Sequence, residues 1–253
     1  MNQVLQGDCL ELMKDIPDKS IDMILCDLPY GTTACKWDTI IPFDLLWEQY
    51  KRVIKDNGAI VLTASQPFTS ALVMSNVKMF KYEWVWRKNR GTGHLNAKKQ
   101  PLLLHENILV FAKGKTIYNP QKTEGKPYQR LNCSRQKTNK GVYGVMDVTT
   151  DTKNSGDRYP LTVIDFSKIE RTLHPTQKPV ALFEYLIKTY TNEGNLVLDN
   201  CAGSFTTAIA SENLKRNWIC IEQDERYCEI GRKRIVENKE RLLMLDNCAK
   251  LNI

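Results

Sequence analysis

The chain has 253 residues, of which 42% are hydrophobic, and its 36 Lys and Arg against 29 Asp and Glu give a formal net charge of +7. This length can bury one large α/β core, whereas no apolar run reaches the roughly 18 residues that a membrane-spanning helix needs. The first residues also lack the basic and apolar segments of a signal peptide, so we expect a cytoplasmic protein that does not contact membranes.

Cysteine, histidine and glycine patterns exclude several kinds of site. None of the eight cysteines has CxxC spacing and the three histidines are far apart in sequence, which disfavours a disulfide framework and a metal site. No predicted strand is followed by GxGxxG, and the GKT run at 114–116 lacks the first glycine of a P-loop. A nicotinamide dehydrogenase and a P-loop nucleotidase are therefore disfavoured.

Apolar patterning predicts an alternation of strands and helices. In chain order, the expected elements are a strand at Ile21–Asp27, a helix at Phe43–Asp56, strands at Gly58–Ser65, Tyr82–Arg87 and Glu106–Ala112, a helix after Pro179 to Tyr190, strands at Asn195–Asp199 and Asn217–Glu222, and a closing helix at Glu225–Leu243. The strands are short and almost continuously apolar, and the helices repeat apolar residues on one face, with Asn57-Gly58 ending the first. The alternation predicts an α/β fold with a doubly wound, mainly parallel sheet.

The pattern breaks between Gly114 and Lys168, where the chain is polar and has no sustained period. From Lys113 to Arg171 it carries twelve basic and six acidic residues, and the run Trp86–Lys99 is basic with no acid at all. Such segregated positive charge indicates a polyanionic partner. We therefore interpret residues 113–171 as an inserted binding region; a surface excursion without function is the alternative for residues 129–157.

The segment DLPY, Asp27–Tyr30, follows the first predicted strand. In open α/β sheets ligands bind beyond the carboxyl ends of strands, and Pro29 restricts the residue before it. A carboxylate, a backbone carbonyl and an aromatic ring are therefore expected close together. The two acceptors could localise the lone pair of an exocyclic amine such as adenine N6, while Tyr30 stacks on the base. Capping of the following turn is the plainer alternative for Asp27.

DLPY resembles the catalytic motif of DNA amino-methyltransferases, which modify adenine N6 or cytosine N4 with S-adenosylmethionine. The resemblance extends through DLPYGTT…KWD, GAIVLTAS, HENILVFAKG, HPTQKPVALFEYLI, VLDNCAGSFTTAIA and WICIEQDERYCEI, in the order of the β class. It implies a Rossmann-like methyltransferase sheet with an inserted target-recognition region. Residues 1–112 would form the catalytic half of this domain, 113–171 the insertion and 172–253 the cofactor-binding half.

The resemblance also implies roles for individual residues. Asp27 and Pro29 would polarise the target amine, and Tyr30 would stack on a base flipped out of the duplex. The S-adenosylmethionine-binding residues would be Asp8, Cys9, Thr176, Lys178, Asp199, Asn200, Cys201, Gly203, Ser204 and Glu222, with Asp8 at the adenine, Glu222 at the ribose, and Thr176 and Lys178 at the methionine carboxylate. DNA contacts would come from Arg87, Lys88, Arg90, Lys98, Lys99, Arg130, Arg135 and Lys137.

Two places depart from the family pattern. Leu28 stands where Pro is usual, and in the cofactor loop Cys201 and Phe205 stand where Phe and Gly are usual. The ring of Phe205 could crowd the methionine moiety, or it could turn inward and replace the ring missing at Cys201. We favour the second alternative.

The sequence thus predicts a site-specific DNA methyltransferase that acts on N6 of a flipped adenine, because Asp heads the motif more often in relatives that modify adenine. The alternatives are an N4-cytosine DNA methyltransferase and a catalytically weak DNA-binding remnant of the family. The expected partners are double-stranded DNA, a second copy of the chain and the restriction nuclease of a restriction–modification system.

Overall fold

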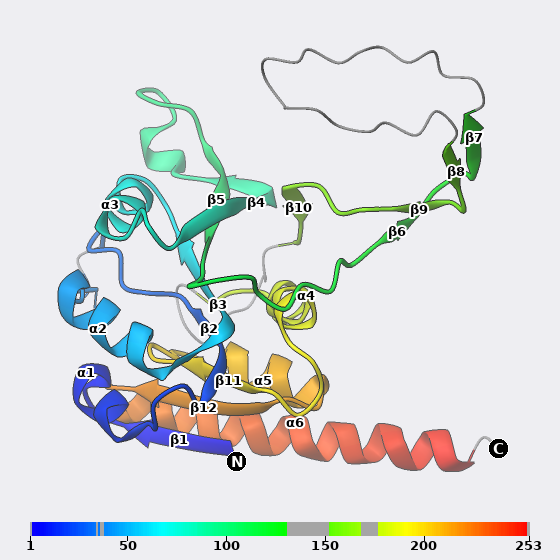
Figure 1. The fold of residues 1–253 in the computed structure, drawn as a ribbon. Helices are drawn as coiled ribbons and strands as arrows, with labels where there is room; N and C mark the ends of the chain where they lie inside the picture. Colours follow the sequence, from blue (N-terminus) through cyan, green and yellow to red (C-terminus); the bar gives the residue numbers. More distant parts are fainter. Residues whose placement is uncertain (1, 34, 36–37, 131–151, 168–176, 252–253) are drawn as a thin grey trace. The chain divides into compact units, whose positions relative to one another are not determined.

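The computed structural model describes residues 2–33, 35, 38–130, 152–167 and 177–251 (Figure 1). The chain divides into two compact units. The larger unit comprises Met1–Asn119 and Thr162–Ile253, and the smaller comprises Pro120–Leu161. No helix in these described ranges is long and apolar enough to cross a membrane.

An eight-stranded sheet forms the centre of the larger unit. Its strands are β1 (Asn2–Gln6), β2 (Ile21–Cys26), β3 (Ile54–Ala64), β4 (Phe80–Thr92), β5 (Leu103–Phe111), β10 (Val163–Asp165), β11 (Leu196–Asp199) and β12 (Asn217–Glu222). They lie in the order β1-β12-β11-β2-β3-β5-β4-β10. All neighbours pair in parallel except β5, which is antiparallel to both β3 and β4. The predicted mainly parallel α/β sheet is therefore confirmed.

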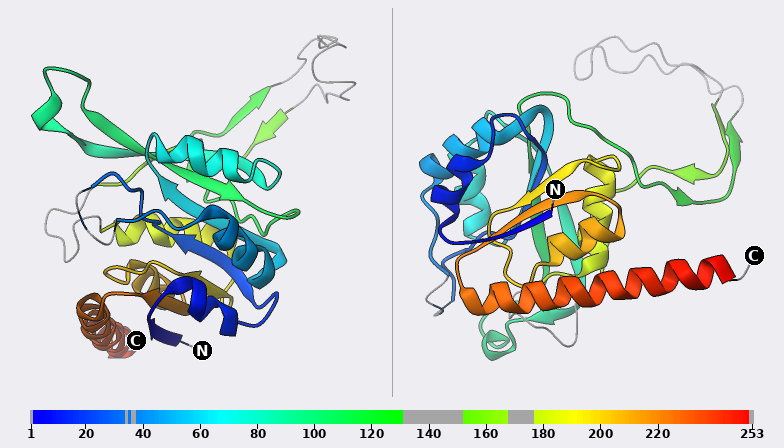
Figure 2. Two further views of the ribbon diagram at one scale, coloured as in Figure 1. Left: turned by 90° about the vertical axis from the view of Figure 1, so that its left-hand side faces the viewer. Right: turned by 90° about the horizontal axis from the view of Figure 1, so that it is seen from below.

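Helices cover both faces of the sheet (Figures 1 and 2). The elements against one face are α1 (Cys9–Leu12), the 3₁₀ turn η1 (Met13–Asp15), α2 (Phe43–Val53) and α3 (Phe68–Ser75), and those on the other side are α4 (Val180–Tyr190), α5 (Thr206–Asn213) and α6 (Glu225–Leu251). This is the doubly wound arrangement.

The pleat of β2 explains how the two faces are filled. Successive side chains of a strand point to opposite faces. Ile24 and Cys26 accordingly pack in the cluster under α2, whereas Met23 and Leu25 pack in the cluster under α4. The next residue in the second series is Asp27, so the strand directs this carboxylate toward the α4 side of the sheet edge.

The structure differs from the predicted elements in several details. The first helix ends at Val53 rather than at Asp56, because β3 already begins at Ile54, which pairs with Ile21. The antiparallel direction of β5 was not expected, since its apolar run has the same pattern as a parallel strand. The short elements β1, β10, α1 and α3 carry too few residues to show a period and were missed.

The smaller unit is built from two antiparallel ribbons. β6 (Thr123–Glu124) pairs with β9 (Asp157–Arg158), and β7 (Tyr128–Arg130) pairs with β8 (Thr152–Asn154). Lys122 Nζ lies 2.6 Å from Asp157 Oδ2 and 4.7 Å from the Tyr159 ring centroid. The predicted recognition residues Arg135 and Lys137 lie outside the described part of the chain.

The boundaries of this unit are narrower than the predicted insertion at 113–171. At the entry, the Asn119 N–H donates to the carbonyl of Thr189 in α4 at 2.7 Å. At the exit, Val163–Asp165 forms β10 at the edge of the main sheet. Both ends of the predicted insertion therefore belong to the larger unit.

Candidate active site

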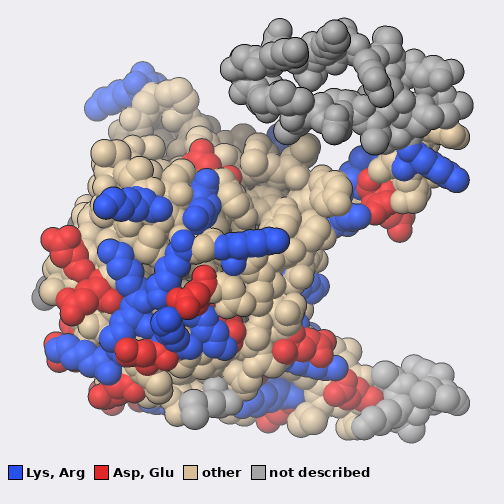
Figure 3. Space-filling model, in the orientation of Figure 1, with Lys and Arg blue, Asp and Glu red and all other residues tan. Residues whose placement is uncertain are grey.

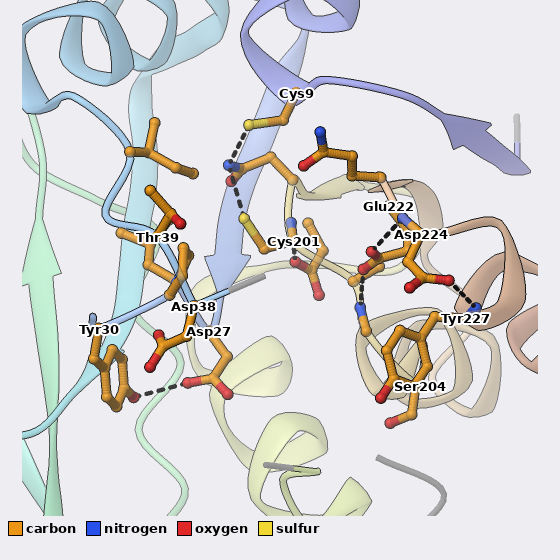
Figure 4. A pocket seen from close by; sticks show the side chains of 18 of the residues that line it. Cys9, Asp27, Tyr30, Asp38, Thr39, Cys201, Ser204, Glu222, Asp224 and Tyr227 are labelled. Carbon is orange, nitrogen blue, oxygen red and sulfur yellow. Dashed lines mark hydrogen bonds between the residues drawn. The ribbon is translucent and has the colours of Figure 1, made fainter. Parts of the chain in front are cut away.

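A cavity of about 740 Å³ opens where the carboxyl ends of β2, β11 and β12 meet (Figure 4). The sequence-predicted residues that line it are Asp8, Cys9, Asp27, Pro29, Tyr30, Lys178, Asp199, Asn200, Cys201, Gly203, Ser204 and Glu222. These residues come from segments up to 214 positions apart, from Asp8 to Glu222. Thr176 lies outside the described residues.

Asp27 is held by donors on three sides. Tyr30 Oη donates to Asp27 Oδ1 at 2.8 Å, and the Thr63 hydroxyl donates to the same oxygen. Lys178 Nζ donates to Asp27 Oδ2 at 2.8 Å. A carboxylate has about four lone-pair positions, so these donors leave about one position, on Oδ2, for a further donor in the cavity.

Tyr30 is fixed as firmly as the carboxylate. Its ring stacks on Phe68 with centroids 5.1 Å apart, and Lys178 Nζ lies 5.7 Å from the Tyr30 centroid. Burial, with the nearby Asp27 charge, raises the pKa of Tyr30 well above its usual value, so the hydroxyl stays a donor. The turn that follows needs Gly31, whose φ is +67° and where a Cβ would lie 2.9 Å from Ile40.

Lys178 lies at the centre of the site rather than at its rim. Besides Asp27, its Nζ lies 3.2 Å from Glu106 Oε2. Burial by itself would lower the pKa of Lys178, but the two carboxylates outweigh it and raise that pKa. Lys178 lines the cavity, and the expected contact with the methionine carboxylate stays a prediction: a ligand carboxylate would share this ammonium group with Asp27 and Glu106.

The cofactor loop between β11 and α5 is built around Asp199. The Thr207 hydroxyl donates to Asp199 Oδ2 at 2.5 Å, and the Cys201 N–H donates to Oδ1 at 3.1 Å. Burial nevertheless raises the pKa of Asp199 to about 7. At the end of β12, Glu222 accepts the Gly203 N–H at 2.7 Å, which joins this strand to the loop.

Asp8 lines the cavity from the turn between β1 and α1. Its Oδ1 accepts the Leu10 N–H at 2.8 Å and the Glu11 N–H at 3.4 Å, so it caps α1. Asp8 Oδ2 is not engaged in this capping and remains the oxygen that could meet a ligand.

Phe205 turns inward, as the sequence analysis favoured. The ring is fully buried among Ala208, Trp218 and Cys228, below α6, and it does not line the cavity. It therefore does not crowd a ligand. The suggested replacement of the ring at Cys201 is wrong, because Cys201 packs against the separate cluster under α2.

Asp38 is a site residue that the sequence analysis missed. It is buried, lines the cavity, and accepts the N–H groups of Gly31, Thr32 and Thr33 at 2.9, 2.9 and 2.7 Å. These bonds, with the Thr33 hydroxyl, outweigh burial and lower the pKa of Asp38. The KWD motif carried this signal, but only the turn at Gly31 shows what its aspartate binds.

Basic residues project from the catalytic edge on the hairpin between β4 and β5. β4 runs in the same direction as β2 and β3, so this hairpin leaves the sheet at the edge that carries Asp27 (Figure 2, left). Arg90, Lys98 and Lys99 are exposed on it. On the side of the larger unit shown in Figure 3, by contrast, basic and acidic side chains are intermingled.

Two predicted DNA contacts need qualification or correction. Lys88 is wrong as a phosphate contact in this structure, because its side chain is only 4% exposed and its Nζ lies 2.8 Å from Glu106 Oε1. Arg87 is exposed but is bound through two nitrogens to Asp165, at 2.5 and 2.7 Å. A phosphate would have to compete with that carboxylate.

Across the residues that the structure covers, no group of three or more His, Cys, Asp or Glu side chains could hold an ion.

Comparisons with known proteins agree on one family. A family model described as DNA methylase matches residues 21–233. The chain is 30% identical over 258 residues to the DNA adenine methyltransferase YhdJ of Escherichia coli (strain K12), covering 92% of this chain and 82% of YhdJ. It is 27% identical over 251 residues to the Type II methyltransferase M.HpaI of Haemophilus parainfluenzae, covering 92% of this chain and 74% of M.HpaI. The crystal structure of the M1.HpyAVI–SAM complex matches with a TM-score of 0.65 and 27% identity, covering 92% of this chain and all of that one.

Proposed function

The chain belongs to the DNA methylase family of N6 and N4 amino-methyltransferases, and we propose that it methylates N6 of adenine in duplex DNA with S-adenosylmethionine as the methyl donor. The observation that carries the proposal is the Asp27 carboxylate, fixed at the cavity wall with one acceptor position left on Oδ2. Asp at the head of the motif and the 30% identity to a DNA adenine methyltransferase favour adenine over cytosine.

Asp27 and the Pro29 carbonyl would accept the two N–H groups of the target amine. This localises the nitrogen lone pair, which in a free base is delocalised into the ring. The lone pair would form the new N–C bond as the bond between the methyl carbon and the sulfonium sulfur breaks and its electron pair stays on sulfur. The nitrogen would then lose one of its protons, which Asp27, hydrogen-bonded to that amine, would be placed to accept. Positioning and a preformed negative charge account for the catalysis in this scheme.

The residues on the other side of the cavity fit S-adenosylmethionine. Asp199 is a buried carboxyl group whose pKa near 7 suits a cationic partner, while Glu222 and Asp8 each keep acceptor positions for hydroxyl or amine hydrogens. When bound, S-adenosylmethionine supplies an electrophilic methyl group. Asp199 would bind its ammonium group, Glu222 its ribose hydroxyls and Asp8 its adenine amine.

DNA would bind across the catalytic edge. The exposed hairpin residues Arg90, Lys98 and Lys99 would contact phosphates beside the cavity, and the smaller unit, which contains Arg130, would read sequence. Flipping the adenine costs a few kcal/mol, and Tyr30, already stacked on Phe68, would offer the incoming base an ordered ring. A second copy of the chain and a partner nuclease remain predictions from the resemblance.

The test is product identification. The protein is incubated with mixed-sequence duplex DNA and methyl-labelled S-adenosylmethionine, and the labelled nucleoside is identified by mass after digestion. N6-methyladenine is expected, and Asp27→Ala should abolish it while still binding S-adenosylmethionine. Labelled N4-methylcytosine would overturn the choice of base. Cofactor binding without any transfer would support the remnant alternative.

A further inference from the structure

A row of polar side chains runs behind Asp27 across four adjacent strands. Asp27 follows β2, Thr63 lies on β3, Glu106 on β5 and Lys88 on β4. On each of these strands every second side chain packs under α4, as Leu25 does in β2. The four residues are the next members of that series, at the edge of the sheet where β2 ends. Pleat alternation therefore brings these four residues to one face, where Lys178 approaches from the start of α4.

The charged members of this row alternate in sign. Lys178 Nζ lies 2.8 Å from Asp27 Oδ2 and 3.2 Å from Glu106 Oε2, and Glu106 Oε1 lies 2.8 Å from Lys88 Nζ. The side chains of Asp27, Lys178, Glu106 and Lys88 are 18%, 7%, 15% and 4% exposed. Four ionisable groups are thus withdrawn from water in the order minus, plus, minus, plus.

Removing charges from water is costly, so a row of buried ion pairs contributes little to the stability of the folded protein on its own. Its position next to Asp27 suggests another use. During methyl transfer the target nitrogen gains positive charge, which the Asp27 carboxylate stabilises and the adjacent Lys178 ammonium opposes. A second carboxylate on the far side of Lys178 offsets that opposition.

We propose that Glu106 is a positioning residue for catalysis, with Lys88 as its counter-ion: by sharing the Lys178 ammonium, Glu106 leaves more of the negative charge of the Asp27 carboxylate to act on the target amine. This inference rests on the proposed function. Glu106 and Lys88 do not line the cavity, so they act through Lys178 rather than on the substrate. The resemblance gives Glu106, in the HENILVFAKG block, no role, and it gives Lys88 only the DNA contact that its burial contradicts.

Other ionisable groups around Asp27 must be considered when pH is used as a readout. Among the described residues these are Cys26 and Tyr30 on its own segment, Asp199 at the end of β11, and Lys178, Glu106 and Lys88. Burial raises the pKa of Cys26 to about 12, so its thiol stays neutral. Asp199 titrates in every variant, so the informative quantity is the difference between variants.

The experiment measures single-turnover methyl transfer between pH 5 and 9, with S-adenosylmethionine at saturation. In Glu106→Gln, Lys178 pairs with Asp27 alone. The rate of methyl transfer should therefore fall about tenfold or more, and the acid limb of the pH–rate profile should move to lower pH. In Lys178→Met the acid limb should move to higher pH by about one to three units. Lys88→Met strengthens the hold of Glu106 on Lys178 and should move the limb upward by less.

Opposite shifts distinguish this role from a structural one, because a loosened site would shift every variant alike. The matched control is Lys55→Met, which removes an ion pair of 2.6 Å with the buried Asp22 at the other end of the same strands. It should leave the rate and the pH profile unchanged. The double variant Lys178→Met/Glu106→Gln leaves no unpaired charge beside Asp27, and its limb should lie above that of Glu106→Gln.

The inference is overturned if Glu106→Gln retains the wild-type rate and pH profile, or if its limb shifts in the same direction as that of Lys178→Met. If Lys178→Met does not fold, the double variant compared with Glu106→Gln gives the same decision. Failure of the wild type to methylate any base would instead overturn the proposed function.

Discussion

Replacement of Gly231 by alanine is expected to destabilise the protein, although removing a glycine from a helix normally stabilises it. In an exposed helix the exchange gains about 1 kcal/mol. Here a Cβ at 231 would lie 2.1 Å from Cδ2 of Phe205 and 2.5 Å from its Cγ and Cε2. The ring is fully buried and cannot swing aside. Overpacking of this kind costs about 1–3 kcal/mol; the 2.1 Å contact points to the upper end, and the net loss is about 2 kcal/mol.

A double-mutant cycle in urea measures this contact. Phe205→Ala alone should cost about 3–5 kcal/mol, as expected for a deleted core ring. With that ring gone, Gly231→Ala should no longer destabilise and should recover about 1 kcal/mol, which gives a coupling of about 3 kcal/mol. Glu229→Ala, exposed on the same helix, is the control and should change stability by no more than about 0.5 kcal/mol. A stabilising Gly231→Ala, or additive effects, would refute the packing derived for Phe205.

The same variants separate stability from ligand binding. Phe205 has φ +62°, a conformation that glycine adopts more readily, so Phe205→Gly relieves backbone strain while it removes a core ring. Because the ring does not line the cavity, affinity for S-adenosylmethionine should not increase in Phe205→Gly. Weak wild-type affinity that this variant restored would contradict the inward placement.

Four further outcomes follow from the site and the basic hairpin. Because burial raises the pKa of Asp199 to about 7, S-adenosylmethionine affinity should fall up to about tenfold per pH unit below 7, with proton release on binding that calorimetry in two buffers detects and Asp199→Asn removes. The same carboxyl holds its proton in the folded state, so its contribution to stability should decrease from about pH 4 to pH 7. Lys98→Ala with Lys99→Ala should reduce the slope of log K for DNA against log salt by about 1.8; an unchanged slope would remove the hairpin from the DNA interface. Asp38→Ala, which leaves three N–H groups without their acceptor, should slow methyl transfer more than tenfold, and Asp38→Asn should slow it less.

The sequence predicted which residues line the cavity better than it predicted the contacts that these residues make behind it. Asp27, Asp199 and Glu222 each follow or end an apolar strand, and the carboxyl ends of parallel strands share one edge, so their convergence could be predicted. The approach of Glu106 to Lys178 could not be predicted. Glu106 lies on β5, whose antiparallel direction is not encoded in an apolar run, and only that direction brings the start of β5 to the catalytic edge.

Phe205 illustrates the same limit at a single position. Set against the family pattern, a ring in place of glycine could have crowded the methionine moiety of the cofactor, which was one of the two alternatives left by the sequence. In the structure the volume that the ring adds at the start of α5 is matched by the volume that Gly231 leaves in α6. The two positions are 26 residues apart and become neighbours only when α6 packs against α5. Since the ring occupies this recess and leaves the cavity open, Phe205 no longer argues against turnover, and the fixed Asp27 carboxylate argues for it.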